Sequence, residues 1–149
     1  MPRFLRLALA LSVLAALAIG NVASTAASGP KILDARMAAL PTPGLVLQGV
    51  TGGGLPWVID EGHARLFADG HLEVEVEGLV LASSHTNPVT AGKAVVTCNG
   101  AEVASTATVP FSPAGDAEVD AVVQLPSPCL APAVFFTTGT DRWLAVTGF

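Results

Sequence analysis

Few residues of this chain have side chains suited to chemistry, and the three histidines are the first to consider. They are His63, His71 and His85. A metal site would need two or three of them to converge with carboxylates nearby. In an extended hairpin His63 and His71 stand eight residues apart, too far for one ion on a flat sheet. We therefore interpret the histidines as exposed side chains and predict neither a bound metal nor a cofactor.

The string Ser83–His85 places two hydroxyls beside an imidazole. Adjacent residues rarely bring a nucleophile and its base to one reacting atom, and the base needs a third group to orient it. The chain has no Gly-X-Ser-X-Gly elbow. Glu73, Glu75 and Glu77 alternate as on one face of a strand, unlike the ligands of a calcium loop. These patterns predict a solvated acidic face and no catalytic residue, so the chain is not expected to be an enzyme.

A glycine-rich segment, Thr51–Trp57, reads Thr-Gly-Gly-Gly-Leu-Pro-Trp. It lacks the Lys-Ser/Thr pair of a phosphate-binding P-loop. We interpret the glycines as permitting a tight bend beside Trp57, and Trp57 as a packing residue of the core or its rim. If Trp57 is instead exposed, it is the best candidate for a partner contact, because aromatic anchors dominate binding hot spots.

Residues 1–27 have the three parts of a secretory signal peptide. A basic head, Met1–Arg6, precedes an apolar run, Leu7–Ile19, and a tail of small residues suited to cleavage near Ala26 or Ala27. As a helix the apolar run would span about 20 Å, short of the roughly 30 Å of a bilayer core. We predict a secreted, extracellular protein without membrane attachment after cleavage.

The exported part is acidic. The whole chain has 7 basic and 12 acidic residues and a net charge of −5, and removal of Arg3 and Arg6 with the signal leaves 5 against 12, or −7. Such a surface is unsuited to nucleic acid or to anionic lipid, both of which need clustered cations. Charged residues make up only 13% of the chain, which favours a compact core over a disordered acidic tail.

The two cysteines, Cys98 and Cys129, both lie in the exported part. In an oxidising compartment an isolated pair most simply forms one disulfide, and two buried free thiols are the alternative. Cys129 follows two prolines in the segment 125–132, which excludes a central strand there. We expect the disulfide to attach this irregular crossing to the core.

Downstream of residue 45, short runs rich in Val, Leu and Thr are separated by Gly, Pro, Asn and Asp, which is typical of strands and turns. We expect strands over 45–50, 55–59, 64–67, 72–81, 94–98, 102–109, 117–125, 133–138 and 143–147. This pattern predicts an all-β fold, a single antiparallel, immunoglobulin-like β-sandwich over residues 45–149. Before it, residues 28–44 form a lead-in segment in which 31–40 is expected to make a turn or two of helix, stopped by Pro41.

Register can be predicted for two hairpins. A three-residue loop, Ala68–Gly70, pairs Leu66 with Leu72 and Ala64 with Val74, whereas a two-residue loop would mix the buried and solvent faces. The same register sets Arg65 opposite Glu73 and His63 opposite Glu75. The second hairpin turns at Asn99-Gly100 and pairs Cys98 with Ala101 and Val96 with Val103, so Cys98 should point inward.

Several strings resemble a group of small secreted actinobacterial proteins that are uncharacterised. The likeness spans roughly residues 45–149 and includes Gly53–Gly62, the 125–132 segment and the Arg142–Phe149 ending. It implies a secreted β domain and no activity. The first hairpin alone also resembles CHRD domains, although the His-rich string that usually follows it there is missing.

These observations favour an exported, non-catalytic β-sandwich that binds an extracellular or cell-envelope partner of unknown identity. A small secreted enzyme, or an accessory subunit of one, is the first alternative. A weak metal-binding protein built on the histidines and the acidic face is the second.

Overall fold

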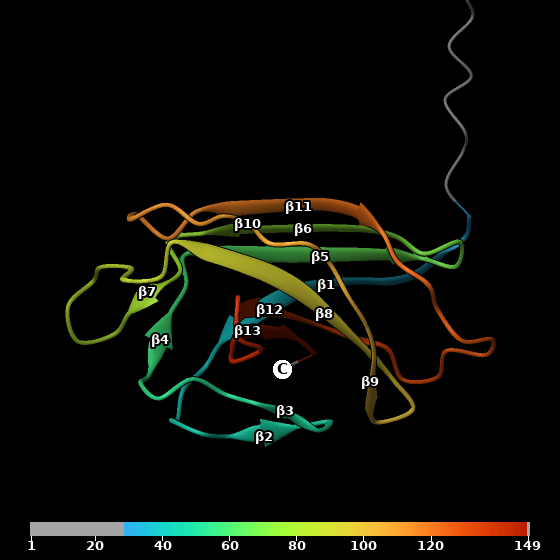
Figure 1. The fold of residues 1–149 in the computed structure, drawn as a ribbon, viewed down its shortest axis with the longest axis horizontal. Coiled ribbons are helices and arrows are strands. Elements are labelled where there is room, and N and C mark those ends of the chain that lie inside the picture. The colour runs from blue at the N-terminus through green and yellow to red at the C-terminus, as the bar shows by residue number, and fades with distance from the viewer. Residues whose placement is uncertain (1–28, 149) are drawn as a thin grey trace, which may run out of the picture.

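The computed structural model describes residues 29–148 (Figure 1), so the predicted signal peptide, 1–27, lies outside the described residues. Every regular element of this part is a β-strand, and none of its segments is a helix that could cross a membrane. The strands are β1 (Lys31–Ala39), β2 (Val46–Leu47), β3 (Val50–Thr51), β4 (Trp57–Val58), β5 (Glu61–Phe67), β6 (His71–Glu77), β7 (Val80–Leu81), β8 (Ala91–Cys98), β9 (Ala101–Ser105), β10 (Val109–Pro110), β11 (Ala117–Val122), β12 (Ala133–Thr138) and β13 (Trp143–Thr147).

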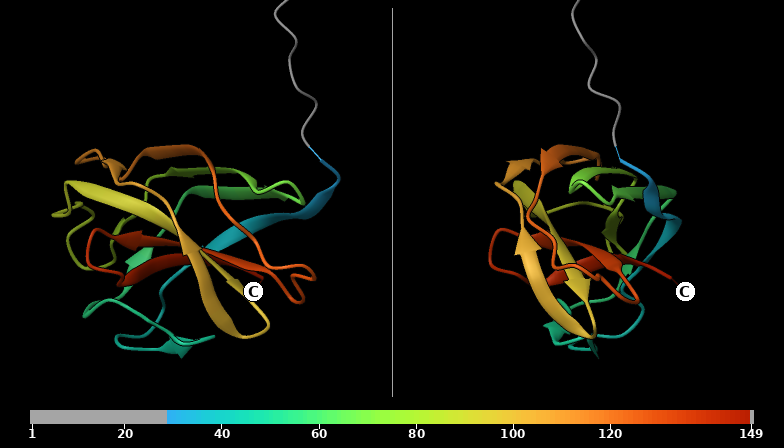
Figure 2. Two further views of the ribbon diagram at one scale, coloured as in Figure 1. Left: turned by 45° about the vertical axis from the view of Figure 1, so that its right-hand side comes forward. Right: turned by 90° about the vertical axis from the view of Figure 1, so that its right-hand side faces the viewer.

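Nine of these strands form one antiparallel sheet in the order β10-β8-β12-β13-β1-β5-β6-β11, with β9 also paired to β8. The sheet folds over on itself because β1 belongs to both of its halves: the first part of β1 pairs with β5, and Met37–Ala39 pair with β13. The strands β5, β6 and β11 thus lie in a layer across from β8, β12 and β13 (Figure 2). The predicted all-β sandwich is confirmed.

The expected helical turns in the lead-in segment are wrong, because Lys31–Ala39 is strand β1. Inward and exposed side chains alternate in this stretch with a period of two. Leu33, Ala35 and Met37 are turned inward, and Asp34 and Arg36 are exposed. The backbone of β1 is hydrogen-bonded to strands on both sides. Pairing with distant strands therefore decides its conformation, as tertiary context commonly does over local propensity.

The core lies between the two layers and extends beyond them. Phe135, Phe136 and Trp143 are fully buried, and β12 and β13 are buried on both faces. Their second face is covered by the β2–β3 hairpin, which lies below them in Figure 1. The indole N–H of Trp143 donates to the carbonyl of Leu45 at 2.9 Å, and the hydroxyl of Thr97 on β8 donates to Gln48. This cover explains the unbroken apolar runs of β12 and β13.

The β5–β6 hairpin has the predicted register. Leu66 pairs with Leu72, Ala64 with Val74, Arg65 with Glu73 and His63 with Glu75. Gly70 closes the three-residue loop at a φ of 91°, in the left-handed region that favours glycine.

The β8–β9 hairpin is predicted only in part. Asn99 and Gly100 form the turn with φ of 58° and 80°, and Cys98 pairs with Ala101, as predicted. The predicted pair of Val96 with Val103 is wrong, because the register shifts between Thr97 and Val96, and Val96 pairs with Ala104. A β-bulge adds one residue to β9 and leaves Val103 unpaired and partly exposed.

Cys98 and Cys129 form the predicted disulfide, with their Cα atoms 5.1 Å apart. Cys98 is buried, and the proline-rich segment that carries Cys129 has no strand, also as predicted. The bond therefore attaches the long crossing from β11 to β12 to the end of β8.

Candidate functional site

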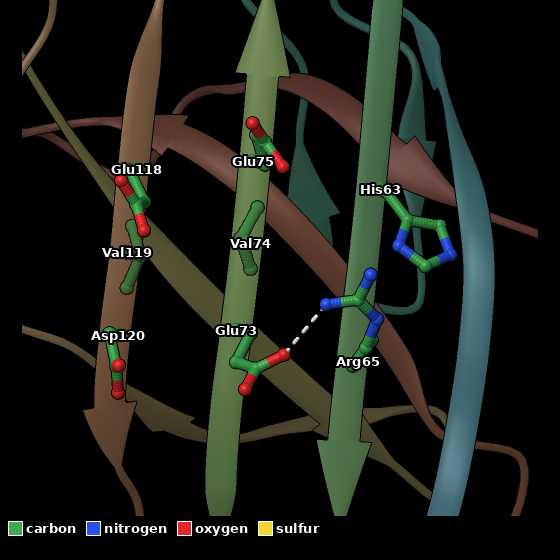
Figure 3. Close-up of a pocket in the computed structure, with 8 residues that line it drawn as sticks. All are labelled: His63, Arg65, Glu73, Val74, Glu75, Glu118, Val119 and Asp120. Carbon is green, nitrogen blue, oxygen red and sulfur yellow. Dashed lines mark hydrogen bonds and ion pairs between the residues drawn. The ribbon is translucent and has the colours of Figure 1, made fainter.

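The first candidate is the charged face, by which we mean the outward side chains of β1, β5, β6 and β11. The register aligns them in two rows across the four strands: Asp34–Arg65–Glu73–Asp120 and Arg36–His63–Glu75–Glu118. A shallow hollow of about 240 Å³ lies over β5, β6 and β11 (Figure 3). Acidic groups dominate its β6 and β11 side, and basic groups its β5 side.

The charged face pairs part of its charge internally. The guanidinium of Arg65 donates to Glu73 at 2.9 Å, and this hydrogen bond lowers the pKa of the Glu73 carboxyl and raises the pKa of Arg65 (Figure 3). His63 lies 2.7 Å from a carboxylate oxygen of Asp34 on β1, although its register partner is Glu75. A hydrogen bond from Lys31 lowers the pKa of Asp34. These pairs are what an antiparallel sheet needs to keep a charged surface stable.

The three histidines do not converge. His63 contacts Asp34, and His71 lies 3.3 Å from Glu73 on its own strand. His85 is exposed on the loop after β7. Between residues 29 and 148, no three His, Cys, Asp or Glu side chains are grouped so that they could hold a metal ion. Ser84 hydrogen-bonds to the hydroxyl of Thr86, and among the described residues neither Ser83 nor Ser84 hydrogen-bonds to the His85 ring.

The second candidate is a hollow of about 270 Å³ at the end of the molecule where β4 pairs with β7, on the left of Figure 1. Most of its wall is apolar, and four segments contribute to it. We call it the Trp57 groove; it is lined by Gly53, Gly54, Leu55, Trp57, Leu81, Pro88, Val89, Thr138, Thr140, Arg142 and Leu144.

Trp57 forms the inner part of this groove. It is 6% exposed, stacks on Phe111 with ring centroids 6.4 Å apart, and its backbone N–H donates to the carbonyl of Leu40. Trp57 is therefore a packing residue, as predicted, and only an edge of it reaches the groove. Gly52, in the same glycine-rich string, packs closely on Leu40, because a Cβ there would lie 2.8 Å from a Leu40 methyl.

The sequence interpretation identified Trp57 and the glycines but missed the rest of the groove. Thr138 ends β12, Thr140 and Arg142 lie in the turn between β12 and β13, and Val89 lies in the segment before β8. These segments are distant from Trp57 in the chain, and none carries a local motif. Only the pairing of β12 with β8 and β13, and the cover of β13 by the Gly53 segment, brings them together.

No protein-family model, no curated protein and no solved structure matches this chain. The resemblances noted in the sequence therefore stay predictions. The function has to be argued from the two candidate surfaces themselves.

Proposed function

We propose that this chain is exported and that its folded part is a non-catalytic binding module for an extracellular or cell-envelope partner, with the Trp57 groove as its contact surface. The leader-like pattern of residues 1–27 supports export, and the Cys98–Cys129 disulfide is consistent with an oxidising compartment.

The observation that carries the proposal is the apolar groove with an exposed side chain at its rim. Leu55 is 53% exposed and lines the groove beside the buried Trp57. Concave apolar sites with a few polar groups are the usual form of binding sites. The charged face is the weaker candidate, because its Arg65 and His63 already have carboxylate partners on neighbouring strands.

Export is tested by expressing the full chain with a C-terminal tag in an actinobacterial host. We expect the tagged product in the medium, with an N-terminus within a residue or two of Ala27 by mass spectrometry. An intact N-terminus on cell-associated protein would contradict export.

Binding is tested by retention of the tagged protein on isolated cell wall and on immobilised culture-supernatant proteins. Leu55→Asp places a charge at the groove rim and should abolish retention. Leu130→Asp is the matched control, because Leu130 is 59% exposed near the disulfide and outside the groove. Both are surface substitutions that change stability little. Equal retention of the two variants would contradict a role for the groove.

A further inference from the structure

The two tryptophans differ in how their indole N–H groups are satisfied. The N–H of Trp143 donates to the carbonyl of Leu45 at 2.9 Å. Trp57 is equally part of the core, at 6% exposure, but its N–H finds no acceptor among residues 29–148. In this region no fully buried polar side-chain atom lacks a partner, so the Trp57 nitrogen must reach open space.

That open space is the Trp57 groove. A Cβ placed on Gly53 would lie 3.7 Å from Nε1 of Trp57 and 3.3 Å from Leu144, and all three residues line the groove. The absence of a side chain at Gly53 therefore leaves the indole N–H accessible. A hydrogen-bond donor on a mostly buried ring that opens into an apolar wall can donate to the acceptor of a ligand in place of water.

Arg142 adds a positive charge to the same groove. It is exposed, and in the described part of the chain it forms no ion pair. Its neighbour Asp141 is instead paired with Lys93 at 2.7 Å. Lys31, Lys93 and Arg65 all have carboxylate partners, which leaves Arg36 on β1 and Arg142 as the described cations without one.

We propose that the Trp57 groove binds a carboxylate that carries a compact apolar group, an inference that rests on the groove being the binding surface proposed above. The apolar group lies against Leu55 and Leu144, and the carboxylate accepts from the Trp57 N–H and faces the Arg142 guanidinium. Arginine and indole donors both suit an anionic acceptor, and charge-assisted hydrogen bonds are the stronger ones. A volume of about 270 Å³ admits one or two apolar residues or a small acid, not a long chain.

The probe is N-acetyl-leucine, with N-acetyl-leucinamide as its uncharged counterpart. The full chain contains two tryptophans, so a ¹⁵N spectrum has two indole signals. We expect N-acetyl-leucine at millimolar concentration to shift the Trp57 signal and leave the Trp143 signal in place. The amide should bind about tenfold more weakly, since it lacks the charge that Arg142 recognises. No shift of the Trp57 signal, or equal affinity for acid and amide, would overturn the proposal.

Two variants separate the carboxylate contact from general charge. Arg142→Gln should reduce affinity for the acid to that for the amide. Arg36→Gln is its matched control, because it removes the other cation without a partner, from the charged face, and changes the net charge equally. Equal loss of affinity in the two variants would contradict a specific site.

A last comparison identifies the source of the carboxylate. If an acetylated tripeptide ending in leucine binds more tightly than N-acetyl-leucine, the ligand is a peptide C-terminus, and if it binds more weakly, the ligand is a small free acid. The Trp57 signal and the retention assay together distinguish failure of the carboxylate proposal from failure of the proposed binding function. An unshifted Trp57 signal with retention still lost in Leu55→Asp refutes the carboxylate alone, whereas unchanged retention in Leu55→Asp refutes the groove as the contact surface.

Discussion

The charged face and the Trp57 groove are two surfaces of one molecule that differ in how their polar groups are paired. On the charged face Arg65 donates to Glu73, and His63 contacts Asp34 across the strands. In the groove an indole N–H and a guanidinium have no acceptor in the described part of the chain. The charged face thus pairs Arg65 and His63 internally, although its Arg36 has no carboxylate partner, whereas the mostly apolar groove leaves both of its donors unused.

This difference indicates where to look for function in a β-sandwich without a catalytic motif. Charge density alone is a poor guide, because cross-strand pairs consume it. Accessible donors in an apolar wall that have no partner within the protein are more informative, since they are free to bind an acceptor of a ligand. Four substitutions or conditions test the comparison, beginning with the largest expected effect.

Replacing Trp57 tests whether the groove belongs to the core. Trp57→Ala removes a ring that is 6% exposed and stacked on Phe111, so it should lower the free energy of unfolding. The expected loss is about 3–5 kcal/mol in urea unfolding, as for other buried aromatic residues. Glu75→Gln on the charged face is the control and should change stability by less than about 0.5 kcal/mol. Similar losses of unfolding free energy in Trp57→Ala and Glu75→Gln would contradict the view that the groove is part of the core and the charged face is peripheral.

Removing the disulfide tests whether the groove depends on the opposite end of β8. Cys98 ends β8, whereas Val89 precedes the start of that strand at the groove. The double variant Cys98→Ser, Cys129→Ser should lose roughly 3–4 kcal/mol of stability, because the bond closes a loop of about 30 residues in the unfolded chain. Below the unfolding transition its Trp57 indole signal should be unchanged. A displaced signal would mean that the groove is not locally determined.

The sequence predicted most of the β architecture because much of it is determined locally. The Ala68–Gly70 loop admits one register that keeps Leu66 and Leu72 on the buried face, so the β5–β6 hairpin could be derived in full. The β8–β9 hairpin has an equally clear turn, but the bulge at Val103 adds a residue to β9 that no local pattern encodes.

Long-range pairing explains the remaining failures. β1 looks like a short helix when its residues are considered alone, and becomes a strand only between β5 and β13. Only part of the candidate site could likewise be predicted from the sequence. The Gly53–Trp57 string indicates one wall of the groove, whereas Arg142 lies in a turn that has no motif. Trp57 could be named from the sequence, but its unpaired nitrogen could not, because whether any strand supplies an acceptor depends on the tertiary fold.

A single methyl group tests the accessibility of the Trp57 nitrogen. Gly53→Ala places a Cβ 3.7 Å from that atom without requiring a left-handed backbone, so it should weaken N-acetyl-leucine binding severalfold. Its effect on stability should stay within about 1 kcal/mol, because the lower entropy of the unfolded alanine chain offsets the tight contact with Leu144. Gly54→Ala is the control, since a Cβ there meets nothing within 4 Å, and it should bind as the unmodified protein does. Equal affinity of the two variants would place the ligand elsewhere.

The smallest effect concerns the acid stability of the charged face and its adjoining loop. Backbone N–H groups of Gly29 and His71 donate to Asp69 and lower its pKa, and the hydrogen bond from Arg65 lowers the pKa of Glu73. A carboxyl whose pKa is lower in the folded state stabilises the fold above its unfolded pKa, and this contribution disappears as pH falls through the folded value. The unfolding temperature should therefore fall as the pH is lowered below about 4, near the ordinary pKa values of Asp and Glu.

In Asp69→Asn that decline should be shallower, whereas Glu102→Gln on β9 controls for the loss of one negative charge. Thermal unfolding followed from pH 6 to pH 2 measures both slopes. Because these groups are exposed, the whole effect should be modest and should shrink in high salt. An equally steep decline in Asp69→Asn and in the unmodified protein would mean that the loop hydrogen bonds do not stabilise the charged face. The internal pairing of that face would then contribute less to stability than we infer from its contrast with the groove.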